Sequence, residues 1–292
     1  MERTLEGKYM LVTGATSGMG KVTALRLAQQ GASVVLVGRN PDKTEATAQE
    51  IRRQTPQSDV QFLVADLSSL AQVRALARAY QSAYPRLDVL INNAGGMFAR
   101  RQLSADGLEM TFALNVFAPF LLTHLLLDTL QASAPARIIT VASATHAGKH
   151  VPFDDLTHEK RYKPLDVYAE SKLMAIMLTY ELARRLEGTG VTANTLHPGV
   201  VATNFGKGEG GMWNIMFTAL APFSLSPEKG AQTAIYLASS SDVANVSGKY
   251  FVKSRPARSS DASYDGDAQQ RLWAISERLT GLPAPDSVGR AG

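Results

Sequence analysis

The 292-residue sequence contains no cysteine. This absence excludes a disulfide scaffold, a thiolate zinc site, an iron–sulfur centre and a cysteine nucleophile. It is also compatible with a reducing compartment, and we expect a cytoplasmic protein.

Long hydrophobic runs are missing as well. The most apolar run, Val116–Leu130, is interrupted by Pro119, His124 and Asp128. It falls short of the ~20 apolar residues that a spanning helix needs. Residues 1–14 show no basic region followed by an apolar core. We therefore expect neither a signal peptide nor a transmembrane segment.

The sequence has no strong excess of one charge. Lys and Arg number 30 against 26 Asp and Glu, which gives a net charge of +4. The pairs Arg52-Arg53, Arg100-Arg101 and Arg184-Arg185 are scattered among acidic residues. This distribution is typical of solvated helix faces, so we expect a small-molecule substrate and no nucleic-acid partner.

Apolar bursts alternate with helix-like segments along most of the chain. The bursts predict strands at Tyr9–Thr13, Ser33–Val37, Val60–Val64, Val89–Ile91, Arg137–Val141, Val191–Leu196 and Gly248–Val252. The segments between them predict helices at Lys21–Gln30, Asp42–Gln54, Leu70–Tyr84, Leu108–Leu130 and Tyr168–Leu186. Apolar strands alternating with helices predict an α/β fold, a doubly wound parallel sheet with helices on both faces.

The pattern places residues 1–252 in one domain. The remaining residues, 253–292, are expected to form a polar linker, a short helix at Ala268–Leu279 and a loose tail. This is too little sequence for a second hydrophobic core.

A glycine-rich turn follows the first predicted strand. It runs from Thr13 to Gly20 with the spacing G-x-x-x-G-x-G and includes Gly14, Thr16, Ser17, Gly18, Met19 and Gly20. Between a strand and a helix, such a turn lets the backbone approach a pyrophosphate, and the helix N-terminus offers free N–H groups. We predict a dinucleotide-binding loop.

The end of the second predicted strand suggests which dinucleotide binds. Arg39 and Asn40 stand where an NAD-selective site usually carries an acidic residue for the ribose hydroxyl. A guanidinium cannot accept from a hydroxyl but suits a 2′-phosphate, so we predict NADP(H) in preference to NAD(H). The alternative is that Asp42 reaches the ribose. Asp66-Leu67 is a second candidate contact, near the adenine, or else a helix N-cap.

Tyr168 and Lys172 are four residues apart at the start of a predicted helix, so they lie on one face. Lowering a tyrosine pKa by about three units requires ~4 kcal/mol. One cation at ~4 Å supplies about that much at an effective dielectric constant of 20. The pair is therefore a candidate acid–base centre beside a charged nicotinamide.

The ordered motifs resemble those of the short-chain dehydrogenase/reductase family over residues 7–252. They are TGATSGMG at 13–20, DL at 66–67, NNAG at 92–95, Asn115, Ser143, YAESK at 168–172 and HPG at 197–199. Several further stretches, including SAPARIITVAS and RLWAISERLTGL, resemble the retinol dehydrogenase and WW-domain oxidoreductase branch.

The resemblance implies roles for a catalytic set. Tyr168 would exchange a proton with the substrate oxygen, and Ser143 would hydrogen-bond that oxygen. Lys172 would bind the nicotinamide ribose and lower the Tyr168 pKa. Asn115 would hold a water that links Lys172 to solvent.

The resemblance also implies cofactor contacts, a topology and an assembly. The further contacts would come from Asn92, Ala94, Gly95, Pro198, Gly199 and Thr203. The expected strand order is 3-2-1-4-5-6-7. A homodimer or homotetramer would form through the helices at 108–130 and 168–186.

Residues 200–226 are expected to form a lid over the substrate. They are rich in apolar side chains: Met212, Trp213, Ile215, Met216, Phe217, Leu220 and Phe223. These either pack onto the body of the domain or line a cleft for a lipophilic aldehyde, ketone or alcohol. The first hypothesis is therefore a carbonyl reductase or alcohol dehydrogenase.

Two further features of the sequence allow other interpretations. His146 and His150 could suggest a zinc site, but Gly148 lies between them in a predicted loop, so we expect no metal. The run at 206–211 lacks the G-K-[ST] of a phosphate loop and predicts a hinge. Alternative functions are a carbon–carbon double-bond reductase of the same family and a catalytically silent dinucleotide sensor.

Overall fold

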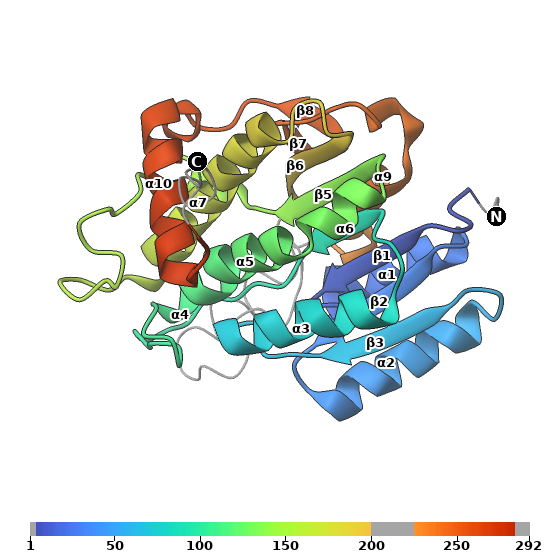
Figure 1. Cartoon of the computed structure of the whole chain (residues 1–292). Helices are drawn as coiled ribbons and strands as arrows, with labels where there is room; N and C mark the ends of the chain where they lie inside the picture. The colour runs from blue at the N-terminus through green and yellow to red at the C-terminus, as the bar shows by residue number, and fades with distance from the viewer. Residues whose placement is uncertain (1–3, 200–224, 284–292) are drawn as a thin grey trace, which may run out of the picture.

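The computed structural model describes residues 4–199 and 225–283, and every structural statement below concerns these residues. They contain an eight-stranded sheet with the order β3-β2-β1-β4-β5-β6-β7-β8 (Figure 1). The strands from β1 to β7 pair in parallel, and β8 pairs antiparallel with β7. The predicted doubly wound α/β fold is confirmed, with one strand more than the expected seven.

The strands coincide closely with the apolar bursts of the sequence. They are β1 (Tyr9–Thr13), β2 (Ser33–Gly38), β3 (Val60–Val64), β4 (Val89–Asn92), β5 (Ala136–Val141), β6 (Val191–His197), β7 (Tyr250–Val252) and β8 (Arg255–Ala257). The central strands are apolar almost throughout because helices cover both of their faces.

Helices form a layer on each side of the sheet. They are α1 (Gly18–Gln29), α2 (Pro41–Gln54), α3 (Leu70–Ala83), α4 (Met110–Phe112), α5 (Ala118–Leu125), α6 (Leu127–Ala132), α7 (Pro164–Arg185), α9 (Pro227–Ser239) and α10 (Gly266–Thr280). The sequence patterns did not single out α9.

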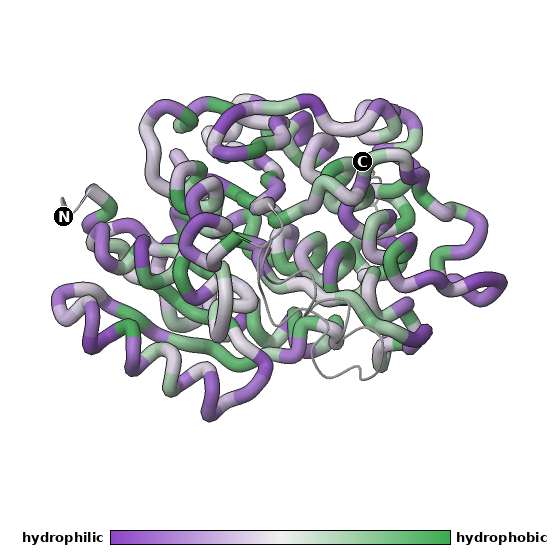
Figure 2. Tube along the Cα trace, turned by 180° about the vertical axis from the view of Figure 1, so that it is seen from behind, coloured by the Kyte–Doolittle hydropathy of each residue, from purple (hydrophilic) through white to green (hydrophobic). Residues whose placement is uncertain are grey.

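The two faces of the sheet belong to separate hydrophobic cores. On β1, Leu11 packs into the core that contains α3, α5, α7 and α10, whereas Met10 and Val12 pack into the core of α1, α2 and α9. This alternation follows from the two-residue period of a strand. Figure 2 shows the same arrangement from behind, with hydrophobic strands inside and hydrophilic segments on the outer helices and loops.

The single helix expected at 108–130 is not formed. Instead, α4 passes into a π-helical segment, η1 (Ala113–Phe117), which is followed by α5 and α6. The Ala118 N–H donates to the Ala113 carbonyl, five residues back. Pro119 has no N–H, so it cannot make the usual i+4 hydrogen bond to the Asn115 carbonyl. Such a break often marks a functional position, and Asn115 lies within it.

The polar stretch after β7, expected as a linker, is largely structured. It contains β8 and the short 3₁₀ helix η5 (Asp261–Tyr264), and α10 begins two residues later. The predicted helix at 268–279 is confirmed within α10. Side-chain and tertiary contacts, which composition does not reveal, order this segment.

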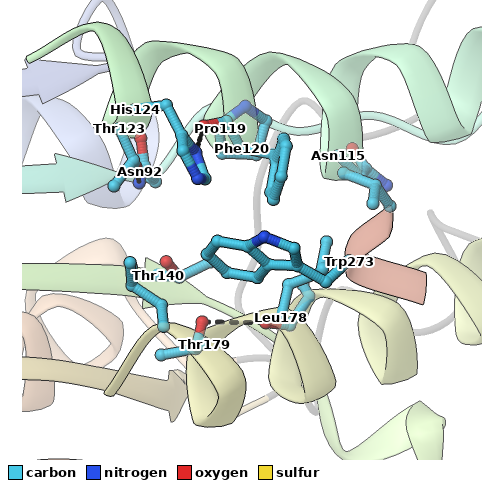
Figure 3. Close-up of a pocket in the computed structure, with 13 residues that line it drawn as sticks. Asn92, Asn115, Pro119, Phe120, Thr123, His124, Thr140, Leu178, Thr179 and Trp273 are labelled. Atoms are coloured by element: carbon cyan, nitrogen blue, oxygen red, sulfur yellow. Dashed lines mark hydrogen bonds between the residues drawn. The ribbon is translucent and has the colours of Figure 1, made fainter. Parts of the chain in front are cut away.

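Helix α10 lies beside α5 and α7 (Figure 1), and its Trp273 side chain fills the groove between those two helices (Figure 3). This side chain is 3% exposed, and its ring meets Phe120 edge-on with a centroid distance of 5.0 Å. The guanidinium of Arg185, on α7, lies 4.2 Å from the centroid of the Trp273 ring. The indole N–H donates to Glu277 at 2.7 Å. One aromatic side chain therefore joins three helices.

We predict that Trp273→Ala lowers the free energy of unfolding by about 3 kcal/mol, because the groove cannot close around the lost ring. Urea unfolding followed by circular dichroism measures the change. Gln270→Ala, at an exposed position on the same helix, is the matched control. Equal stability of the two variants would contradict the packing role given to Trp273.

Candidate active site

The parallel sheet brings the predicted site residues to one edge. Loops that follow β1, β4 and β5 are neighbours because these strands are neighbours in the sheet. The glycine loop follows β1, the NNAG motif spans the end of β4, and Ser143 follows β5. Ligands of open α/β sheets bind at the carboxyl ends of the strands.

The glycine loop has the backbone that close approach requires. Gly14 has φ +64°, and a Cβ built on it would lie 2.8 Å from the Ala94 Cα. An alanine at this position would therefore be strained and would also clash. Helix α1 begins at Gly18, and the side chain of its N-cap residue, Ser17, makes no capping hydrogen bond. The N–H groups of the first turn are thus suited to an anion.

Asn93, which the sequence analysis did not select, joins this loop to the loop after β4. Its side-chain amide donates to the carbonyls of Thr13 and Gly14 at 2.8 and 3.1 Å. Thr13 Oγ1 in turn accepts from the N–H groups of Asn93 and Ala94, each at 3.0 Å. The NNAG motif was the available signal, but only the structure shows that its second asparagine has this part.

Asn115 is held by both of its amide atoms. Its Oδ1 accepts from the Gly96 N–H at 2.8 Å, and its Nδ2 donates to the Gly96 carbonyl and to Ser171 Oγ, each at 2.9 Å. Ser171 Oγ donates to the Tyr168 carbonyl at 2.6 Å. Ser171, also missed from sequence, therefore connects Asn115 to the turn of α7 that bears Tyr168 and Lys172.

Tyr168, Ser143 and Lys172 lie together. A hydrogen bond joins the side chains of Tyr168 and Ser143. Lys172 is 4% exposed, its Nζ donates to the Val141 carbonyl at 3.0 Å, and it lies 5.4 Å from the centroid of the Tyr168 ring. The structure thus brings the predicted catalytic groups into one network.

The electrostatics of this network differ from the expectation in one respect. Burial raises the pKa of Tyr168 to about 12, although the Ser143 hydrogen bond acts in the opposite direction. Burial also lowers the pKa of Lys172 to about 8. Loss of solvation therefore outweighs the Ser143 hydrogen bond, and the predicted lowering of the Tyr168 pKa is not found.

Hydrogen bonds hold the loop that follows β5. Ser143 Oγ accepts from the Thr145 N–H at 3.3 Å, and the Ala144 N–H donates to His197 Nδ1 at 3.2 Å. His146 is buried, whereas His150 is exposed. The two rings therefore do not share a site, and no group of three metal-ligating side chains gathers within residues 4–199 and 225–283.

The residues predicted near the adenine end occupy loop positions after β2 and β3. Arg39 is exposed at the end of β2. Asn40 caps α2, since its Oδ1 accepts from the Lys43 N–H at 2.9 Å. Asp66 Oδ1 accepts from the N–H and hydroxyl of Ser68 at 3.0 and 2.7 Å, and Leu67 is buried. Arg39 thus presents a cation to solvent at this edge.

Asn92, predicted as a cofactor contact, is buried, unlike the exposed Arg39 and Asn40. Its side chain donates to Thr123 Oγ1 on α5 at 3.1 Å. Figure 3 shows it beside a cavity between α5, α7 and α10 that also meets Asn115. At about 30 Å³ this cavity has room for one or two water molecules but not for an organic substrate.

The last predicted contacts follow β6. Gly199 has φ +88°, a conformation that favours glycine, and Pro198 precedes it. Thr203 and nearly all of the expected lid lie outside the described residues. Across the part of the chain that the structure does describe, no helix has the length and apolar character to span a membrane.

Comparison with known proteins places this site in a family. A family model for short chain dehydrogenases matches residues 8–211. Human retinol dehydrogenase 13 is 44% identical over 289 residues, covering 97% of this chain and 87% of the relative. Human retinol dehydrogenase 12 is 39% identical over 278 residues, covering 95% of this chain and 88% of the relative.

Solved structures agree with the sequence matches. A protein from Mycobacterium paratuberculosis, described as uncharacterized, superposes with a TM-score of 0.78 at 31% identity, and the match covers 96% of each chain. RhlG of Pseudomonas aeruginosa, solved as an NADP active-site complex, has a TM-score of 0.68 at 27% identity, covering 91% of this chain and 98% of that one.

The fold, the ordered motifs and these matches lead to one conclusion. The chain belongs to the short-chain dehydrogenase/reductase family, in its retinol dehydrogenase branch, and is an oxidoreductase that interconverts carbonyl and alcohol groups.

Proposed function

We propose that this enzyme uses NADP(H) to interconvert a lipophilic aldehyde or ketone and its alcohol, with Tyr168 as the general acid and base. The observation that carries the proposal is one hydrogen-bonded network. Ser143 and Tyr168 share a hydrogen bond, Lys172 lies beside the Tyr168 ring, and Asn115 contacts the same turn of α7 through Ser171. The glycine loop and the start of α1 fit a dinucleotide pyrophosphate.

In the reductive direction, the bound nicotinamide supplies the hydride. The Ser143 hydroxyl donates a hydrogen bond to the substrate carbonyl oxygen and holds it beside Tyr168. The Tyr168 hydroxyl transfers its proton to that oxygen as negative charge develops there. In oxidation, the Tyr168 phenolate takes the proton from the alcohol.

The tyrosine must regain its proton after each reduction. Lys172 Nζ, 5.4 Å from the ring centroid, would stabilise the phenolate that reduction leaves. The Asn115 carbonyl lacks its usual i+4 donor because Pro119 has no N–H, and we propose that it holds a water on this path. A pKa of about 12 keeps Tyr168 protonated near pH 7, as a proton donor must be.

We predict that Tyr168→Phe lowers turnover by at least roughly 10²-fold because the acid is removed. NADPH binding, followed by quenching of intrinsic fluorescence, should persist. Tyr236→Phe on α9, on the other face of the sheet, should keep wild-type turnover. Activity of Tyr168→Phe within a few-fold of the wild type would refute the mechanism.

The cofactor preference rests on Arg39. Its guanidinium is exposed directly after β2, and a cation there suits a 2′-phosphate, since a charged hydrogen bond to a phosphate contributes about 1.5–3 kcal/mol. Asp42, in the first turn of α2, is the alternative ribose contact.

We predict that Arg39→Ala weakens NADPH binding by roughly 10-fold or more and leaves NADH binding nearly unchanged. Titration of both cofactors at physiological salt measures the two dissociation constants. Arg53→Ala, an exposed arginine at the end of α2, should change neither. Tighter binding of NADH than of NADPH by the wild type would overturn the assignment.

The substrate class follows from relatives that are named as retinol dehydrogenases and from the apolar residues of the segment 200–226. We predict that NADPH oxidation is fastest with large apolar aldehydes such as retinaldehyde and slowest with small polar carbonyl compounds. A panel graded in size and polarity, with product analysis, tests this order. Faster turnover of the small polar compounds would refute it.

The cytoplasmic location and the homo-oligomer remain predictions.

A further inference from the structure

Residues Ser259–Tyr264, named here the C-terminal clasp, are fastened between α7 and the start of α10. The Tyr180 hydroxyl of α7 and Ser259 Oγ lie 2.8 Å apart, and Ser259 Oγ and Ser263 Oγ lie 2.6 Å apart. Gln269 Nε2 of α10 donates to the Ser263 carbonyl at 2.6 Å. Ser259, Ser263 and Gln269 are all buried, so these bonds are shielded from water.

His146 connects the clasp to the catalytic serine loop. Its Nδ1 lies 2.6 Å from the Ser143 carbonyl oxygen, and the Ser260 N–H donates to its Nε2 at 3.0 Å. The ring is 4% exposed and meets Tyr250 edge-on at a centroid distance of 5.2 Å. His146 thus spans from the clasp to the residue whose hydroxyl bonds to Tyr168.

The two partners select one form of the imidazole. The Ser143 carbonyl can only accept, so Nδ1 must carry the hydrogen, and the Ser260 N–H can only donate, so Nε2 must be bare. Burial lowers the pKa of His146, which favours this neutral form. The connection therefore works with a single tautomer.

We propose that the C-terminal clasp holds the Ser143 hydroxyl in its catalytic position through His146. The proposal rests on the function proposed above and makes His146 a positioning residue. Ser143 is extended, with φ −154° and ψ 152°, and begins the 3₁₀ turn η2 (Ala144–His146). A hydrogen bond on its carbonyl restrains the same backbone that sets the direction of its hydroxyl. Displacements of about 1 Å can cost roughly 10²-fold in rate.

The first test replaces His146 by asparagine. The shorter side chain keeps a donor near the Ser143 carbonyl but cannot reach Ser260. We expect kcat to fall by roughly 10-fold or more while the KM for NADPH stays within about two-fold, because none of the proposed cofactor contacts comes from this loop. Ser260→Ala keeps the N–H and removes only a buried hydroxyl that has no hydrogen-bond partner within the described residues, so it should behave as the wild type. Wild-type kcat for His146→Asn would overturn the proposal.

The second test separates positioning from general destabilisation. If His146 acts through Ser143, then His146→Asn costs little further activity in a Ser143→Ala background. Equal fold-losses in the wild-type and Ser143→Ala backgrounds would overturn the proposal.

The third test needs no turnover. Long-range ¹H–¹⁵N spectra of the histidine-labelled, cofactor-free protein should show an Nδ1–H tautomer that disappears in His146→Phe. An Nε2–H tautomer for His146 would overturn the clasp connection. Absence of wild-type turnover on the carbonyl panel would instead count against the proposed function, so the two failures are distinguishable.

Discussion

Parallel pairing of β1, β4 and β5 is the constraint on which the site depends. The register places Thr13, Asn92 and Val141 near one edge of the sheet, so loops far apart in sequence begin side by side. The hydrogen bonds between Thr13 and Asn93 then lock two of these loops together. The glycine loop, Asn115 and Ser143 take their positions from this edge, and α7 brings Tyr168 and Lys172 across it.

The layers and most elements of this fold could be predicted from sequence because their signals are local. The apolar burst predicts both ends of strand β1 correctly, and the helical period predicts the ends of α3 to within one residue. The family motifs likewise identified residues that the structure brings together, since glycine turns and the Tyr168–Lys172 spacing are short-range patterns. The strand order was expected from the family resemblance.

Other features could not be predicted because they arise from contacts over long sequence distances or from competing backbone effects. The break at Asn115 follows from a single missing N–H at Pro119, within a run whose apolar content favours one continuous helix. Residues 253–265 are polar, yet side chains such as Tyr180 and His146 order them. The Tyr168 pKa depends on how deeply its hydroxyl is desolvated, and spacing alone predicted the opposite direction.

The sequence also did not predict that Trp273 fills the groove between α5 and α7. A second copy of the chain that used these helices as an interface would have to accommodate α10.

His146 and Ser260, which are hydrogen-bonded, lie 114 positions apart in the sequence. During synthesis, the serine loop therefore emerges from the ribosome well before the clasp. A ribosome that has just released β7 has already delivered Asn115, Ser143, Tyr168 and Lys172. The groove for Trp273 is still open at that moment, and the outer side of the serine loop has no clasp. Domains generally fold as units during translation, once the segments that complete them have emerged. For this enzyme, the serine loop would therefore gain its last contacts only after residues 259–273 have emerged.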